Sequence, residues 1–262
     1  MLDVPDAIPT KFLSKLAKRT TKKYQKSQRK TESRMGLQLS DIAPLTQNQQ
    51  KVFESYYQNR HLFLHGVPGS GKTFLGMYLA LDDLINKKCD QHKLMIVRSL
   101  VSSREIGFLP GTQKEKGAPY EMPYQAICNE LFNRGDSYEI LKRHGMLEFL
   151  STSFNRGITI NNAIVLVDEV QNMSAQELHT IITRVGRDCR IIFCGDIRQN
   201  DLNHKREFSG LSDFMKIIKT MNMFDFIEFE VADIVRDNLV KQYIISRLKL
   251  EDSGAIQSIL KI

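Results

Sequence analysis

The sequence predicts an α/β domain built on a mostly parallel sheet flanked by helices. From residue 45 onward, short apolar runs alternate with segments whose apolar residues recur at helical spacing. Strands that are apolar throughout are typical of a parallel sheet covered on both faces, and their alternation with helices indicates a doubly wound arrangement. The chain has 262 residues, of which 42% are hydrophobic and 26% charged. This composition excludes a disordered or fibrous protein, and the length suffices to bury a sizeable core.

Strands and helices are expected to alternate along most of this domain. Each expected strand is a short apolar run, and the five runs are 61–65, 94–98, 164–168, 190–194 and 224–229. Each expected helix has apolar residues three or four positions apart, and the six segments are 47–58, 72–86, 120–133, 175–185, 211–219 and 235–249. Parallel strands need such crossover helices, because their ends lie at opposite edges of the sheet.

The net charge of +7 is concentrated at the N-terminus. Residues 1–36 hold ten Lys and Arg against three acidic residues, whereas residues 37–262 hold 27 of each sign. We therefore expect two parts, a basic and partly helical arm over 1–36 and a charge-balanced domain over 37–262. A basic segment of this kind indicates contact with nucleic-acid phosphates.

The cysteines and the N-terminus indicate a soluble protein of a reducing compartment. The four cysteines include no CxxC pair and have no histidine at zinc-finger spacing, so we interpret them as free thiols. The first residues lack the basic-then-apolar order of a signal peptide, and no apolar run is long enough to span a bilayer. We expect a cytoplasmic protein with no membrane partner.

Residues 66–73 fit the pattern G-x-x-x-x-G-K-[ST] of a phosphate-binding P-loop. An expected strand precedes the loop and an expected helix follows it, as this motif requires. Lys72 would neutralise the β- and γ-phosphates of ATP, and the Thr73 hydroxyl would ligate Mg²⁺. The alternative without a function is a glycine-rich turn followed by an unrelated lysine. The residues expected to bind the nucleotide here are Gly66, Gly69, Ser70, Gly71, Lys72, Thr73 and Phe74.

Two acids follow the apolar run 163–167, where ligands of an open α/β sheet bind. Asp168 would hold Mg²⁺, and Glu169 would act as general base toward the attacking water. The alternative is that the pair serves the N-terminus of the next helix, where acids are also favoured.

Two glutamines are further candidates for the nucleotide site. Gln199 follows the strand 190–194 and could bond the γ-phosphate or the attacking water. Gln49 lies on the helix before the loop, where its amide could both donate to and accept from adenine. Gln47 and Gln50 are also present, so the choice of Gln49 is open, as is an ordinary polar turn around Gln199.

Together these segments resemble the PhoH family, whose core is similar to the first motor domain of superfamily 1 helicases and to RecA-like P-loop NTPases. The most specific stretch runs from Ile106 to Pro123 and follows the family signature GFLPG…EK…PY…P. The segments 168–172, 183–186, 195–201 and 233–236 also match. The chain departs from the family pattern at Ile158 and Asp237, and its reduced form resembles the bacteriophage-encoded members.

This resemblance implies ATP hydrolysis coupled to single-stranded nucleic acid, RNA favoured, in a translocase or helicase-like ATPase. Because only one motor domain fits in the chain, we expect Arg236 of a neighbouring subunit to complete each site, in a hexameric ring. A role of Arg236 within its own subunit, or in a helix salt bridge, stays open. Arg98 and Arg156 are candidates for nucleic-acid contact, with surface salt bridges as the alternative. A nucleotide-gated binding module with slow ATPase, or a small-molecule kinase, are the alternative functions.

Overall fold

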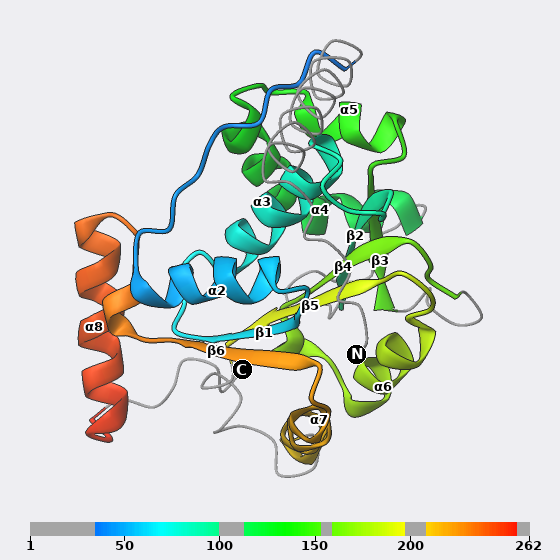
Figure 1. Ribbon diagram of the computed structural model, residues 1–262. Coiled ribbons are helices and arrows are strands. Elements are labelled where there is room, and N and C mark those ends of the chain that lie inside the picture. The colour runs from blue at the N-terminus through cyan, green and yellow to red at the C-terminus, as the bar shows by residue number, and fades with distance from the viewer. Residues whose placement is uncertain (1–34, 100–112, 153–158, 197–207, 256–262) are drawn as a thin grey trace, which may run out of the picture.

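The computed structural model describes residues 35–99, 113–152, 159–196 and 208–255. Six parallel strands form one sheet in the order β3-β2-β4-β5-β1-β6, with helices on both of its faces (Figure 1). The strands are β1 (His61–Gly66), β2 (Lys93–Arg98), β3 (Leu147–Ser151), β4 (Ala163–Asp168), β5 (Arg190–Gly195) and β6 (Phe224–Phe229). The expected α/β class with a parallel sheet is therefore confirmed.

Seven α-helices and two short 3-10 helices connect the strands among the described residues. The α-helices are α2 (Gln47–Tyr57), α3 (Lys72–Ile85), α4 (Gln113–Phe132), α5 (Ser137–Arg143), α6 (Ala175–Arg184), α7 (Phe208–Thr220) and α8 (Asn238–Asp252), and the 3-10 helices are η2 (Val170–Asn172) and η3 (Val231–Asp233). None of the described helices is long and apolar enough to cross a lipid bilayer. The expected arm over 1–36 lies almost wholly outside the described residues.

One strand and one α-helix were absent from the sequence prediction, and three α-helices begin elsewhere, including α7, which begins at Phe208 rather than 211. β3 is an edge strand with a half-exposed centre, so it lacks a continuous apolar run. The seven residues of α5 are too few for a clear periodic pattern. α4 begins at Gln113 rather than 120 and has prolines in its interior, which obscure a helical pattern. α8 begins at Asn238 rather than 235, because Asp237 caps it and accepts a hydrogen bond from the Leu239 N–H at 3.2 Å.

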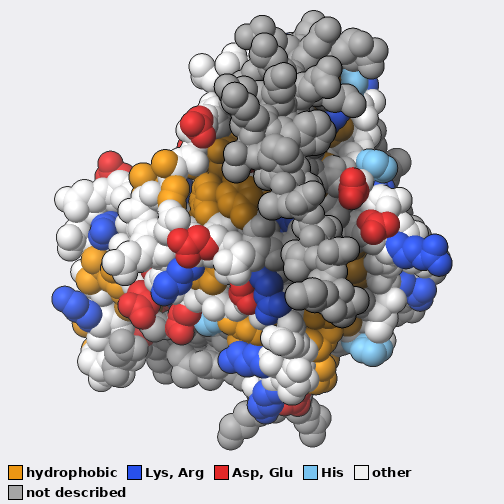
Figure 2. Space-filling view, in the orientation of Figure 1, with side chains coloured by type: hydrophobic (Ala, Val, Ile, Leu, Met, Phe, Trp, Pro, Cys, Tyr) orange, Lys and Arg blue, Asp and Glu red, His pale blue; other side chains and the backbone are white. Residues whose placement is uncertain are grey.

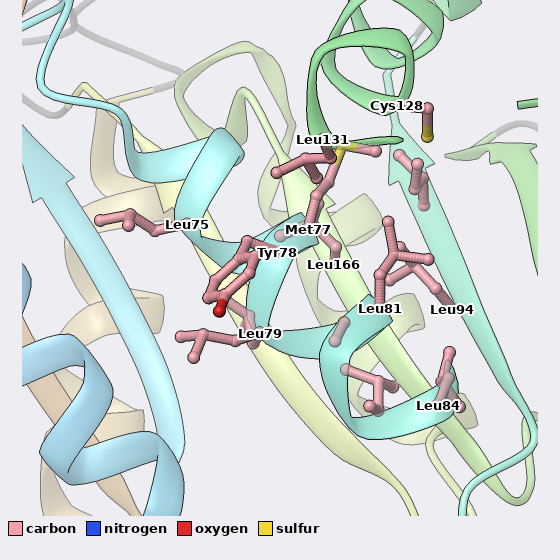
Figure 3. Packing of buried hydrophobic residues seen from close by; sticks show 14 of the residues in the cluster. Leu75, Met77, Tyr78, Leu79, Leu81, Leu84, Leu94, Cys128, Leu131 and Leu166 are labelled. Atoms are coloured by element: carbon pink, nitrogen blue, oxygen red, sulfur yellow. The ribbon is translucent and has the colours of Figure 1, made fainter. Parts of the chain in front are cut away.

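The sheet separates two apolar cores, one on each face. Side chains alternate along the strands, so that Leu62 and Leu64 of β1 face the core under α2–α5, whereas Phe63 faces the core under α6 and α7. Figure 3 shows α3 at the centre of the first core, with its leucines lying against Leu94 of β2, Leu166 of β4 and the α4 residues. This packing holds α3 in place. The C-terminal end of the loop that precedes α3 is therefore fixed as well.

The far end of α3 is tied to the sheet by a buried ion pair. Arg190 at the start of β5 donates to Asp83 Oδ2 at 3.1 Å, and both side chains are at most 10% exposed. The Tyr56 hydroxyl donates to the same oxygen at 3.0 Å, and the Arg190 guanidinium lies 4.2 Å from the Tyr56 ring centroid. These bonds satisfy two charges that would otherwise be costly to bury.

Candidate nucleotide-binding site

A pocket of about 660 Å³ lies at the carboxyl ends of the neighbouring strands β4, β5 and β1. Its floor is the P-loop, and its walls come from the ends of β4 and β5, one face of α4, the segment before α2 and the segment before α8. This position is where ligands of open parallel sheets bind, and the volume suits a nucleotide. The P-loop, Asp168, Glu169, Gln49 and Arg236 are all brought to this one place.

The P-loop is shaped by glycines and by β6. Gly66, Gly69 and Gly71 have φ angles of 119°, 77° and 84°, which residues other than glycine rarely adopt. A Cβ on Gly66 would lie 2.1 Å from the Phe229 carbonyl oxygen, so main chain touches main chain at this point. The Val67 N–H donates to the same carbonyl at 3.1 Å. The strand β6 therefore supports the loop from below.

Lys72 lies in the loop with its ammonium bonded to main-chain carbonyls. Its Nζ donates to the carbonyl oxygens of Gly66 at 3.0 Å and Val67 at 2.8 Å. Burial lowers the pKa of this ammonium, and the acids around it, Asp196 first among them, only partly offset the effect. Ser70 is fully buried and braces the loop through its hydroxyl, which donates to the Val67 carbonyl at 3.0 Å. Phe74 lines the pocket from the first turn of α3.

Asp168 joins the end of β4 to the start of α3. Thr73 Oγ1 donates to Asp168 Oδ1 at 2.9 Å, and the Tyr124 hydroxyl of α4 donates to Oδ2 at 2.8 Å. Burial raises the pKa of Asp168, Glu169 adds to the rise, and the hydrogen bonds from Tyr124 and Thr73 oppose it. A carboxylate and a hydroxyl at this distance offer the oxygen ligands that Mg²⁺ prefers.

The metal would depend on few protein ligands. Among the described residues, no group of three or more His, Cys, Asp or Glu is arranged so that it could hold a metal ion by itself. Mg²⁺ does not need such a cluster, since it usually binds one or two protein oxygens together with substrate phosphates and water. The oxygens of Thr73 and Asp168 therefore fit this ion.

Glu169 is held in an unusual conformation by a glutamine that the sequence analysis did not single out. Its φ of 54° is left-handed, which is uncommon for a residue other than glycine. Gln171 Nε2 donates to Glu169 Oε2, and Gln171 Oε1 accepts from the Asp196 N–H at 3.0 Å. Gln171 thus joins Glu169 to the end of β5. Its only sequence signal was its place in the segment 168–172.

Gln49 is buried at the edge of the pocket with both ends of its amide engaged. Oε1 accepts from the Leu45 N–H at 2.7 Å, and Nε2 donates to the Ser70 carbonyl at 3.2 Å. Each end keeps one further hydrogen-bonding position, so contact with adenine stays a prediction. The observed bonds tie the segment before α2 to the P-loop.

Arg236 lies against the P-loop of its own chain. It stands outside any helix, contrary to the expected helix over 235–249, and it lines the same pocket as Lys72. The preceding Val235 N–H donates to the Gly69 carbonyl at 3.1 Å, and a Cβ on Gly69 would lie 2.9 Å from Arg236 Cγ. Asp233 anchors this segment by accepting from Asn48 Nδ2 at 2.7 Å.

Arg98 lies behind the acidic pair. It is half-buried at the end of β2, in register with Asp168 of β4, and its guanidinium lies 5.6 Å from the Tyr120 ring centroid. Burial lowers the pKa of Arg98, but Tyr124, Glu169 and Asp168 outweigh this and leave it above its usual value. Contact of Arg98 with nucleic acid stays a prediction. Gln199 and Arg156 lie outside the described residues.

The chain matches the family described as PhoH-like protein over residues 41–247. It belongs to the PhoH-like family. It is 33% identical over 200 residues to a PhoH-like protein of Synechocystis sp., covering 76% of this chain and 60% of that protein. It is also 33% identical over 183 residues to Protein PhoH of Escherichia coli K12, covering 69% of this chain and 51% of that protein. The chain thus spans between half and two thirds of the length of these relatives.

Solved structures agree with the PhoH-like chain on the fold. The crystal structure of the HK97 bacteriophage large terminase covers 85% of this chain and 51% of its own, with a TM-score of 0.50 and 11% identity. At this identity the likeness shows the fold alone. Family and fold together give this domain the architecture of P-loop ATPases.

Substitution of Gly66 by alanine should disrupt the P-loop of this PhoH-like domain. The new Cβ overlaps the Phe229 main chain, so β1 and β6 must separate or the loop must shift. We expect a loss of roughly 1–3 kcal/mol in the free energy of unfolding, measured by urea denaturation, together with weaker ATP binding. Gly135→Ala is the matched control, because nothing lies within 4 Å of its Cβ position and its φ is not positive. Equal stability of the two variants would contradict this account of the loop.

Proposed function

We propose that this PhoH-like protein hydrolyses ATP with Mg²⁺ and couples hydrolysis to single-stranded nucleic acid, RNA favoured. The observation that carries the proposal is the convergence of Lys72, Thr73, Asp168 and Glu169 on one pocket. A cation, a hydroxyl, a buried carboxylate and a second, half-exposed carboxylate are the groups that phosphoryl transfer to water needs. An ordinary glycine-rich turn would not require this set.

The mechanism follows from where these groups lie. Lys72 would have to leave the carbonyls of Gly66 and Val67, to which it is bonded, in order to reach the β- and γ-phosphates. Glu169, oriented by Gln171, would accept a proton from a water whose oxygen attacks the γ-phosphorus as the bond to the β-phosphate oxygen breaks. Mg²⁺ at Thr73 and Asp168 would draw charge from the phosphate oxygens.

Arg236 would supply the remaining positive charge from within its own subunit. Its segment is fixed to the P-loop by the Val235 hydrogen bond and to α2 by Asp233, so the arginine stands at the pocket without a partner chain. No hydrogen bond or ion pair within the described residues occupies its guanidinium. This location supports the own-subunit role that the sequence analysis left open, and the hexameric ring stays a prediction.

Nucleic-acid coupling rests on the charge distribution and on the helicase-like resemblance of the core. The excess of +7 lies within residues 1–36. Figure 2 shows basic and acidic side chains interspersed over the described surface on the face drawn. Binding through the basic segment would be largely independent of sequence and would weaken steeply as salt is raised.

Steady-state ATPase activity with and without single-stranded RNA tests the proposed function. We expect Mg²⁺-dependent turnover that RNA stimulates more than DNA does. Glu169→Gln should retain ATP binding and lose at least about 100-fold in kcat, because the general base is gone. Glu139→Gln, at an exposed position of α5, is the matched control. Slow turnover that RNA does not change would support a nucleotide-gated module instead, and phosphate transfer to a small acceptor would support a kinase.

Mixing two inactive variants distinguishes the two possible sources of the arginine. Lys72→Ala and Arg236→Ala should each lose at least about 100-fold in kcat, since each removes a cation from the transition state. If Arg236 acts within its own subunit, every subunit in the mixture carries one defect and no activity returns. If it acts on a neighbour, Arg236→Ala subunits next to Lys72→Ala subunits form intact sites. Recovery of activity on mixing, measured after co-incubation and corrected for each variant alone, would therefore refute the own-subunit role.

A further inference from the structure

Tyr124 is a core residue that reaches the metal-binding end of the ATP site. Its side chain is fully buried under α4, and its hydroxyl donates to Asp168 Oδ2 at 2.8 Å. Oδ1 of the same carboxylate accepts from Thr73 at 2.9 Å, on the side of the P-loop. One oxygen of Asp168 therefore bonds to the residue after Lys72 of the P-loop, while the other is occupied by the tyrosine.

Two neighbouring side chains, Phe149 and Arg98, restrict the position of the Tyr124 side chain. The ring packs against Phe149 of β3 with centroids 5.8 Å apart. Burial raises the pKa of Tyr124, and the charge of the nearby Arg98 guanidinium opposes this rise. Arg98 is itself placed by the register between β2 and β4 and by Tyr120. The tyrosine cannot leave Asp168 without disturbing these neighbours.

The Asp168 carboxylate depends on this hydroxyl because it has little access to water. Asp168 is 5% exposed, so an oxygen deprived of its donor would have to turn toward another partner or stay unsatisfied. Turning the carboxylate would also move Oδ1 away from Thr73. Partners behind a metal ligand commonly set its orientation, and their loss weakens metal binding about 10- to 100-fold.

We propose that Tyr124 is a positioning residue that holds Asp168 for Mg²⁺, with Arg98 holding the tyrosine in turn. The proposal rests on the proposed ATP site and adds α4 to it. Through Tyr124 the occupancy of the metal site is linked mechanically to the helix that also forms a wall of the pocket.

Tyr138 provides a matched control for the removal of this hydroxyl. It is equally buried, and its hydroxyl also donates to a carboxylate, Glu121 Oε2, at 2.6 Å. Neither Tyr138 nor Glu121 lines the pocket. The variants Tyr124→Phe and Tyr138→Phe thus differ in which carboxylate loses its donor.

The measurement is the dissociation constant of ATP for the full chain in EDTA and across a Mg²⁺ titration, with thermal unfolding recorded beside it. For Tyr124→Phe we expect ATP affinity in EDTA within about two-fold of the unmodified chain and a half-saturating Mg²⁺ concentration raised about ten-fold. Tyr138→Phe should leave both unchanged. Arg98→Met is the second variant, for use if Tyr124→Phe folds poorly, and should show the same metal-specific defect at smaller size.

Two results would overturn the role of Tyr124. One is an unchanged Mg²⁺ dependence in Tyr124→Phe and Arg98→Met. The other is an equal loss of ATP affinity in EDTA and in Mg²⁺, which would show that the tyrosine only supports the pocket wall. If the unmodified chain itself binds no ATP, the proposed function fails instead, and the two failures are thereby distinguished.

Discussion

The close main-chain contact between the P-loop and β6 is the constraint on which the site depends. Gly66 lies so near Phe229 that no side chain fits between them, and Val67 bonds to the Phe229 carbonyl. The segment that follows β6 bonds to the loop at a second point, where the Val235 N–H donates to the Gly69 carbonyl. An anion-binding loop of left-handed glycines would otherwise be soft, because glycine has the greatest backbone freedom to lose. Here the last strand of the sheet holds it rigid.

The P-loop and Asp168 could be predicted because each belongs to a continuous sequence motif. The eight residues 66–73 contain the geometry of the loop in their own order, and the strand before and helix after confirm their setting. Asp168 was predictable because the apolar strand β4 ends at it, and carboxyl ends of parallel strands meet at one edge. The strand β3 was not predictable, since an edge strand such as Leu147–Ser151 needs no continuous apolar run.

Residues that act across the fold were harder to place. Arg236 was recognisable as an arginine of interest, but only the path of the chain after β6 shows it beside its own P-loop. Arg98 was a candidate for nucleic-acid contact at the end of a strand, and the sequence did not indicate that it lies half-buried and in register with Asp168. Nothing in the sequence linked Tyr124 to Asp168 or Gln171 to Glu169, because these links arise from contacts that depend on how the chain folds. A sequence pattern predicts which face of a helix or strand is buried. It does not predict which side chains meet when the helices and strands pack together.

A structure of the chain with Mg²⁺, ADP and aluminium fluoride tests the central claim most directly. The account predicts the Lys72 ammonium on the phosphate mimic instead of on the carbonyls of Gly66 and Val67. It also predicts Thr73 and Asp168 at the metal, and Arg236 of the same subunit facing the fluoride. Lys72 still bonded to the two carbonyls beside a bound nucleotide, or an arginine from another subunit in that place, would contradict it.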